Sequence, residues 1–154
     1  MIRYITIKEE DPNTPDAIQL MYELSDALES ITGNSGRSSF NTSDIFGQRA
    51  IFVLAYNENG EAVGCGAIRP IDDKTAEVKR MYAKEKGVGI GTKVLSHLEA
   101  KAQELGYTAL RLETRLINQR AVAFYENRGY YRIPNYGKYV NRPEAVCFEK
   151  RLEK

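Results

Sequence analysis

The sequence has little of what metal-binding and membrane-spanning proteins need. It contains one histidine, His97, and two cysteines, Cys65 and Cys147, without a C-x-x-C pair. A Cys/His metal site is therefore not expected, and the cysteines, which lie in apolar runs, are expected to be buried free thiols. No apolar run approaches the length of about 20 residues that crosses a bilayer, and the N-terminus alternates too regularly for a secretory signal. We expect no membrane partner and a cytoplasmic location.

An excess of charge of one sign is also missing. The 22 basic and 21 acidic residues leave a net charge of +1 and form no long block. Nucleic-acid binding usually needs a basic patch or stripe, so DNA or RNA is not an expected partner. The chain of 154 residues, 42% of them apolar, suits one core, and we expect a single domain over residues 1–154.

Hydrophobic periodicity predicts the order β-α-loop-β-β-β-α-β-α-β-β. The strands are expected over residues 2–8, 50–56, 62–69, 76–83, 109–114, 130–133 and 145–151. One helix should begin after Thr14 and end near Gly33, a second should run from the glycine turn to Gly106, and a third should cover residues 119–128. A meander followed by β-α-β indicates an α+β fold, a mixed sheet with helices on both faces. Strand alternation predicts that Glu77, Lys79, Met81 and Ala83 share one face.

The segment Lys86-Gly87-Val88-Gly89-Ile90-Gly91 joins a strand to a helix. Glycines let backbone N–H groups approach an anion, and the start of a helix adds unpaired N–H groups and a positive dipole end. This combination is suited to a diphosphate. No Walker lysine pair and no complete Rossmann fingerprint is present, so two common nucleotide-binding motifs can be set aside.

Two motifs together resemble the GNAT superfamily of N-acetyltransferases. Lys86-x-x-Gly89-x-Gly91 is similar to the family's Q/R-x-x-G-x-G/A signature, with Lys in the Q/R place. The run from Asn118 to Tyr130 is similar to its N-x-x-A-x-x-F-Y-x-x-x-G-F segment. The C-terminal part resembles bacterial members of undefined substrate. The turn Lys84–Val88 is shorter than is usual in the family, which leaves open which of its residues contacts the cofactor.

The resemblance implies a mostly antiparallel sheet that splays between its fourth and fifth strands, with acetyl-CoA in the wedge as co-substrate and no metal. Asn118 could contact the cofactor or cap the following helix, where asparagine is favoured. The resemblance places the cofactor-binding residues in three segments: the end of the fourth strand (Met81, Tyr82 and Ala83), the glycine turn (Lys86, Gly87, Val88, Gly89, Ile90, Gly91 and Thr92) and the downstream segment (Asn118, Ala121 and Tyr125).

Acetyl transfer to an amine needs a base and benefits from an acid. An alkyl amine with a pKa of about 10.4 is only roughly 0.04% neutral at pH 7, so a positioned group must take its proton. The resemblance implies Tyr125 as the general acid for the leaving thiolate, and Tyr125 could instead be a core aromatic. Glu113 and Glu77 both hold positions where similar enzymes carry a base, and either could instead form a salt bridge. Water could also take the proton, or the amine could arrive neutral.

These features predict an acetyl-CoA-dependent N-acetyltransferase that acts by direct attack on a small-molecule or peptide amine. The alternative is a non-catalytic acyl-CoA-binding or sensing module. The acceptor is left open, although segments 33–47 and 134–142 are expected to shape its pocket. A homodimer is a further possibility.

Overall fold

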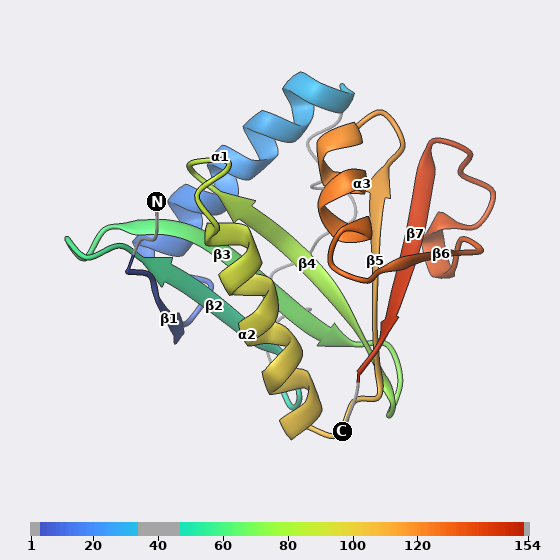
Figure 1. The fold of residues 1–154 in the computed structure, drawn as a ribbon, viewed down its shortest axis with the longest axis horizontal. Coiled ribbons are helices and arrows are strands. Elements are labelled where there is room, and N and C mark those ends of the chain that lie inside the picture. Colours follow the sequence, from blue (N-terminus) through green and yellow to red (C-terminus); the bar gives the residue numbers. More distant parts are fainter. Residues whose placement is uncertain (1–3, 34–46, 153–154) are drawn as a thin grey trace.

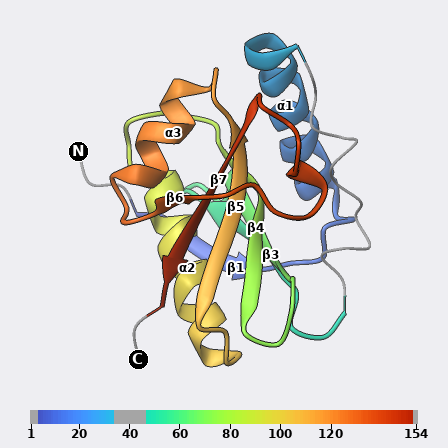
Figure 2. The ribbon, with the colours of Figure 1, turned by 90° about the vertical axis from the view of Figure 1, so that its right-hand side faces the viewer.

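The structure, a computed structural model, describes residues 4–33 and 47–152, so most of the predicted 33–47 loop lies outside the described residues. The described chain forms a sheet in the order β1-β2-β3-β4-β5-β7-β6, with helices on both of its faces (Figures 1 and 2). This confirms the predicted α+β class and the order of the elements. Their bounds are β1 (Thr6–Glu9), α1 (Pro15–Thr32), β2 (Ile51–Tyr56), β3 (Ala62–Pro70), β4 (Thr75–Ala83), α2 (Ile90–Glu104), β5 (Ala109–Arg115), α3 (Gln119–Glu126), β6 (Tyr131–Ile133), the short 3-10 helix η3 (Gly137–Tyr139) and β7 (Ala145–Arg151).

The helices cover the sheet unequally. On one face, Leu20 and Met21 of α1 pack against Phe52 and Leu54 of β2. The other face is covered by α2 and α3, whose buried side chains join a larger core that includes Leu110 of β5. The segment around η3 folds over β5 and β7 on the α1 side (Figure 2). The two faces therefore have different surroundings, and a molecule that reached both would have to pass through the sheet.

The sheet is open between its two central parallel strands. β4 and β5 pair only at Thr75–Ala109, Ala76–Leu110 and Glu77–Arg111, and beyond that they diverge (Figure 1). The last paired level carries a row of polar side chains on the α1 face, because the cross-strand partners are Arg69, Glu77, Arg111, Glu149 and Tyr131 in order. The next level places Lys79 of β4 and Glu113 of β5 on either side of the opening, on the same α1 face.

A β-bulge corrects one sequence prediction. Ala67 pairs with Lys79 and Cys65 pairs with Tyr82, so β4 holds one more residue than β3 at this point. Arg80 takes a left-handed φ of 55° there, and its guanidinium donates to Met21 O at 2.9 Å and to Ser25 Oγ at 2.6 Å. An extra residue reverses the alternation of a strand.

The prediction that Glu77, Lys79, Met81 and Ala83 share a face is therefore wrong. Glu77 and Lys79 lie on the α1 face, whereas Met81 and Ala83 pack into the core under α2. Both cysteines are buried free thiols, as predicted. No helix in the described ranges is long and apolar enough to cross a membrane.

Candidate active site

The turn before α2 has the backbone of an anion site. Gly87 and Gly89 take left-handed φ values of 79° and 87°, and Gly89 is the N-cap of α2 without a side-chain cap hydrogen bond. The first amides of a helix have no partner within the helix, so here they are available to an anion. A Cβ added to Gly87 or Gly89 would meet nothing within 4 Å, so the space beside the turn is open. These features fit a diphosphate.

The start of α2 is braced by the end of α3. A Cβ on Gly91 would lie 3.3 Å from the Phe124 ring, so a larger residue there would require the ring to shift by a few tenths of an ångström. Thr92 accepts a hydrogen bond from Nε of Arg128 at 3.0 Å, and the Arg128 guanidinium stacks 4.0 Å from the centre of the Phe124 ring. Sequence reasoning missed Arg128, because nothing in its position just after α3 shows that its side chain reaches Thr92 of α2.

Among the described residues, the edge of β4 beyond Glu77 has no partner strand on the β5 side. An unpaired strand edge offers donors and acceptors to an extended ligand, and Met81, Tyr82 and Ala83 lie on this edge. Lys86 donates to Ala83 O at 3.0 Å, and its ammonium lies 5.2 Å from the centre of the Tyr82 ring. Burial lowers the pKa of Lys86. A ligand that used Ala83 O would have to displace this ammonium.

Asn118 is the N-cap of α3, which is one of the two roles that the sequence predicts for it. Its Oδ1 accepts from the backbone N–H of Ala121 at 3.3 Å. The amide of Ala121 therefore has its partner within the cap. Any contact of Asn118 or Ala121 with a cofactor stays a prediction.

Tyr125 lies in the core on the α2 and α3 side of the sheet. Its ring makes edge contacts with Phe124 and Tyr130, at centroid distances of 5.1 and 5.7 Å. Burial alone raises the pKa of Tyr125, so its phenol stays protonated at neutral pH. No hydrogen bond of this hydroxyl is found among the described residues, whereas the Tyr130 hydroxyl donates to Glu99 at 2.9 Å. Tyr125 is both a core aromatic, as the alternative stated, and a proton donor without a fixed acceptor.

Glu77 is the most heavily engaged carboxylate of the α1 face. It is 3% exposed, and Arg69 pairs with its Oε1 at 3.1 Å. Its Oε2 accepts from the hydroxyls of Tyr136 and Tyr139 at 2.8 and 3.1 Å. The carboxylate therefore fastens the segment around η3 to the sheet, and burial beside the carboxylate raises the pKa of both tyrosines.

Glu113 is enclosed but poorly partnered. Its Oε2 is buried without a hydrogen bond from any described residue, and the Nε of Arg115 approaches it only to 3.6 Å. Burial raises the pKa of Glu113, and the positive charges of Arg115 and Lys79 oppose the shift. A buried acid with a raised pKa and a free acceptor atom has the properties of a general base.

Lys79 completes the α1 side of the opening. Its ammonium hydrogen-bonds to the Tyr139 hydroxyl at 3.3 Å in a buried position. Burial lowers the pKa of Lys79, against the opposing effect of Glu77. The structure thus gathers Glu77, Lys79 and Glu113 on one face of the opening, whereas Tyr125 lies on the other face.

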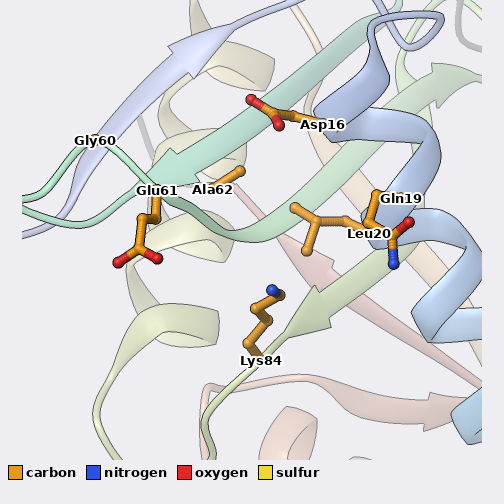
Figure 3. A pocket seen from close by; sticks show the side chains of 7 residues that line it. All are labelled: Asp16, Gln19, Leu20, Gly60, Glu61, Ala62 and Lys84. Carbon is orange, nitrogen blue, oxygen red and sulfur yellow. The ribbon is translucent and has the colours of Figure 1, made fainter.

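A hollow elsewhere on the molecule holds none of the predicted catalytic residues. It has a volume of about 240 Å³ and lies between the start of α1 and the β2–β3 hairpin (Figure 3). Its lining is mostly polar: Asp16, Gln19, Leu20, Gly60, Glu61, Ala62 and Lys84. Within residues 4–33 and 47–152, no group of three or more His, Cys, Asp or Glu side chains is arranged to hold a metal ion.

Comparison with known proteins gives a consistent result. Residues 18–130 match the family model described as the acetyltransferase (GNAT) family. An "IAA acetyltransferase" of Azospirillum brasilense is 30% identical over 152 residues, which are 96% of this chain and 98% of that protein. A crystal structure from Klebsiella pneumoniae, named as an acyl-CoA N-acyltransferase, is 31% identical with a TM-score of 0.81, and the match covers 97% of this chain and 98% of that one.

A GNAT-family acetyltransferase from Elizabethkingia anophelis has been solved with acetyl-CoA bound. It shares the fold at 22% identity and a TM-score of 0.70, and the match covers 96% of this chain and 98% of that one.

The raised pKa of Glu113 predicts how stability depends on pH. Because the folded protein disfavours the charged form, ionised Glu113 lowers stability above its folded pKa, and the penalty is absent below the unfolded pKa of about 4.3. We expect Glu113→Gln to raise the Tm above that of the wild type at pH 7 to 8. The difference in Tm between the two proteins should disappear near pH 4, as measured by thermal unfolding.

Glu144→Gln is the matched control, because Glu144 also pairs with Arg115, at 2.9 Å, but the pKa of Glu144 is lowered by backbone and Arg115 contacts. It should lower the Tm at pH 7. A Tm of Glu113→Gln below wild type at pH 7 would contradict the burial of Glu113 as the dominant effect.

Proposed function

This chain belongs to the acetyltransferase (GNAT) family, and on that premise we propose that it transfers an acetyl group from acetyl-CoA to a primary amine by direct attack. The observation that supports the proposal is a candidate proton acceptor and a candidate proton donor on opposite faces of a sheet whose two central strands diverge. Glu113 of β5 lies on the α1 face, and Tyr125 of α3 lies in the core on the α2 and α3 face. A thioester that entered the opening would lie between them.

The residues of the α2 side would hold acetyl-CoA. The amides from Gly89 to Thr92 suit its diphosphate, and the unpaired edge of β4 from Met81 to Ala83 suits the amide groups of its pantetheine arm. Acetyl-CoA supplies the activated acetyl group. The solved GNAT-family structure with acetyl-CoA bound, which shares this fold, supports the assignment.

Glu113 is the base in this proposal. It takes a proton from the acceptor ammonium, so that the neutral nitrogen can form the new C–N bond while the C–S bond breaks. Its raised pKa and unbonded Oε2 support this role. Glu77 lacks such freedom, since Arg69, Tyr136 and Tyr139 occupy both of its oxygens. We assign Glu77 to positioning the segment around η3.

Tyr125 is the acid. Its phenol stays protonated at neutral pH and its hydroxyl has no competing acceptor among the described residues, so it can donate to the departing thiolate sulfur. The buried Cys65 is unsuited to form an acetyl-enzyme, because burial raises its pKa to about 12 and removes the thiolate at neutral pH. Direct attack therefore suits this chain better than a covalent acetyl-enzyme on Cys65.

Replacing the acid should affect turnover more than binding. We expect Tyr125→Phe to lower kcat by about 10²-fold, as loss of a general acid does, with the acetyl-CoA Kd within twofold of wild type. Release of the CoA thiol with a panel of amines measures kcat, and titration calorimetry measures the acetyl-CoA Kd. Tyr130→Phe removes a neighbouring hydroxyl that is bound to Glu99 and should leave kcat close to wild type. Acetyl-CoA binding without turnover of any amine by the wild-type protein would favour a sensing module.

The glycine turn should control acetyl-CoA affinity through its backbone. A non-glycine residue in the left-handed region costs about 1–2 kcal/mol, so Gly89→Ala should distort the turn and raise the acetyl-CoA Kd about tenfold or more. Gly60→Ala is a matched control: its φ is 79°, its added Cβ also meets nothing within 4 Å, and it lies in the β2–β3 hairpin. Equal acetyl-CoA Kd values for Gly89→Ala and Gly60→Ala would contradict the assignment of the diphosphate to this turn.

The pH profile should separate the two glutamates. The kcat/KM of the wild type should fall at low pH as Glu113 becomes protonated. Glu113→Gln should abolish this acidic limb and lower the plateau by about 10²-fold or more. Glu77→Gln should lower activity but keep the limb, because Glu113 still titrates. Loss of the limb in Glu77→Gln alone would reverse the assignment.

A further inference from the structure

The last residue of β4, Ala83, turns its carbonyl toward the side on which β5 diverges. The backbone N–H of Lys84 donates to Val63 O at 2.8 Å, so these two residues form a hydrogen-bonded pair beside β3. Hydrogen-bonded and non-hydrogen-bonded pairs alternate in an antiparallel ladder, which makes the preceding pair, Ala83 and Gly64, a non-hydrogen-bonded one. The N–H and C=O of Ala83 therefore point away from β3, toward the diverging strand β5.

This carbonyl is occupied by a side chain of the protein itself. Lys86 Nζ donates to Ala83 O at 3.0 Å in a partly buried hydrogen bond. The same ammonium lies 5.2 Å from the centre of the Tyr82 ring, whose hydroxyl donates to Glu23 at 3.2 Å. Lys86 is therefore held at the strand edge that the pantetheine arm would use under the proposed function.

The position of Lys86 is unfavourable for a cation but close to a favourable one. Partial burial lowers the pKa of Lys86, and the charge of Arg120 lowers it further, so both disfavour the ammonium. Gly87 follows Lys86 directly, and Gly89 is the N-cap of α2, whose first amides suit a diphosphate. A lysine side chain is a flexible stem with a compact charge at its end. It can therefore turn from a carbonyl to an anion bound at the neighbouring turn.

This contact makes the two parts of acetyl-CoA depend on each other. A pantetheine arm alone would have to displace Lys86 from Ala83 O with no partner to receive the charge. A diphosphate attracts the ammonium more strongly than a carbonyl does, because both partners are then charged. We propose that Lys86 determines thioester specificity: it covers the β4 edge in the free protein and moves to the diphosphate on binding, so that the site selects thioesters that carry a diphosphate. This inference rests on the proposed N-acetyltransferase function.

The test compares acetyl thioesters that share the pantetheine arm and differ in phosphate. S-acetylpantetheine carries no phosphate, and S-acetyl-4′-phosphopantetheine carries a single one. S-acetyl-dephospho-CoA carries the diphosphate but lacks the ribose phosphate of acetyl-CoA. Kd values without an acceptor amine are measured by titration calorimetry for the tight ligands and by NMR titration for the weak ones. The wild type should bind the two diphosphate ligands far more tightly than the other two.

Lys86→Met should change the affinities for two of these ligands in opposite directions. Because Ala83 O is freed, the Kd for S-acetylpantetheine should fall about two- to tenfold, the range for an intramolecular hydrogen bond. Because the diphosphate loses a cation, the Kd for S-acetyl-dephospho-CoA should rise about threefold or more. Lys86→Arg keeps the charge and should restore most of the diphosphate affinity. A purely structural role of Lys86 would not move the two Kd values in opposite directions.

Lys84→Met is the matched control. It removes the same charge from a nearby position, but the Lys84 ammonium pairs with Glu23 at 3.7 Å and lines the hollow beside α1 (Figure 3). This variant therefore measures the effect of net charge alone. It should leave the Kd for S-acetylpantetheine unchanged and raise the Kd for S-acetyl-dephospho-CoA less than Lys86→Met does.

The possible results separate this inference from the function on which it rests. A Kd for S-acetylpantetheine that is equal or higher in Lys86→Met than in the wild type shows that Lys86 does not cover the edge. A Kd for S-acetyl-dephospho-CoA that rises no more than in Lys84→Met shows that Lys86 does not receive the diphosphate. Either result overturns the inference and leaves N-acetyl transfer in place. If the wild-type protein binds none of the thioesters, acetyl-CoA included, both proposals are wrong.

Discussion

The early divergence of β4 and β5 is the constraint on which the rest of the site depends. The two strands pair at three positions only, up to Glu77 and Arg111. If the β4–β5 pairing continued, the next residues to lie side by side on the α1 face would be Lys79 and Glu113. On the edge of β4 that pairs with β3, the bulge at Arg80 shifts the register by one residue. Because Arg80 is bound to Met21 and Ser25 of α1, helix packing holds the bulge in place. Beyond Glu77 the two strands diverge, and within the described residues the edge of β4 that faces β5 has no partner strand.

Two glutamates on the same face acquire different properties from their partners. Both are largely removed from water, which by itself disfavours a carboxylate. A guanidinium and two tyrosine hydroxyls stabilise the Glu77 carboxylate in place of water. The two tyrosines also hold the segment around η3 to the sheet. Glu113 has only an ion pair with Arg115 at 3.6 Å and one buried oxygen without a hydrogen bond from a described residue. Partners, rather than burial, separate a positioning carboxylate from a candidate base.

Under the proposed function, the two faces of the sheet would serve different substrates. The α2 side provides helix amides, a strand edge and the Tyr125 phenol, which suit a long phosphorylated thioester. The α1 side provides charged side chains at the β4–β5 opening and a loop held by Glu77, which suit a small polar acceptor. A hydrogen-bonded carboxylate thus links the acceptor side to the sheet. Under the proposed function, each substrate would approach from its own face and meet the other only at the opening.

The sequence by itself determined the order of the elements, the glycine turn and the caps, because periodicity, left-handed glycines and capping residues act over a few neighbouring positions. It also brought Tyr125, Glu77 and Glu113 forward as candidates. It could not place Met81 and Ala83, since one bulged residue reverses a strand's faces. Nor could it show the different partners of the two glutamates or the contact of Arg128 with Thr92. Their roles depend on side chains from distant segments, such as Tyr136 and Tyr139 on Glu77, and only the tertiary structure brings those together.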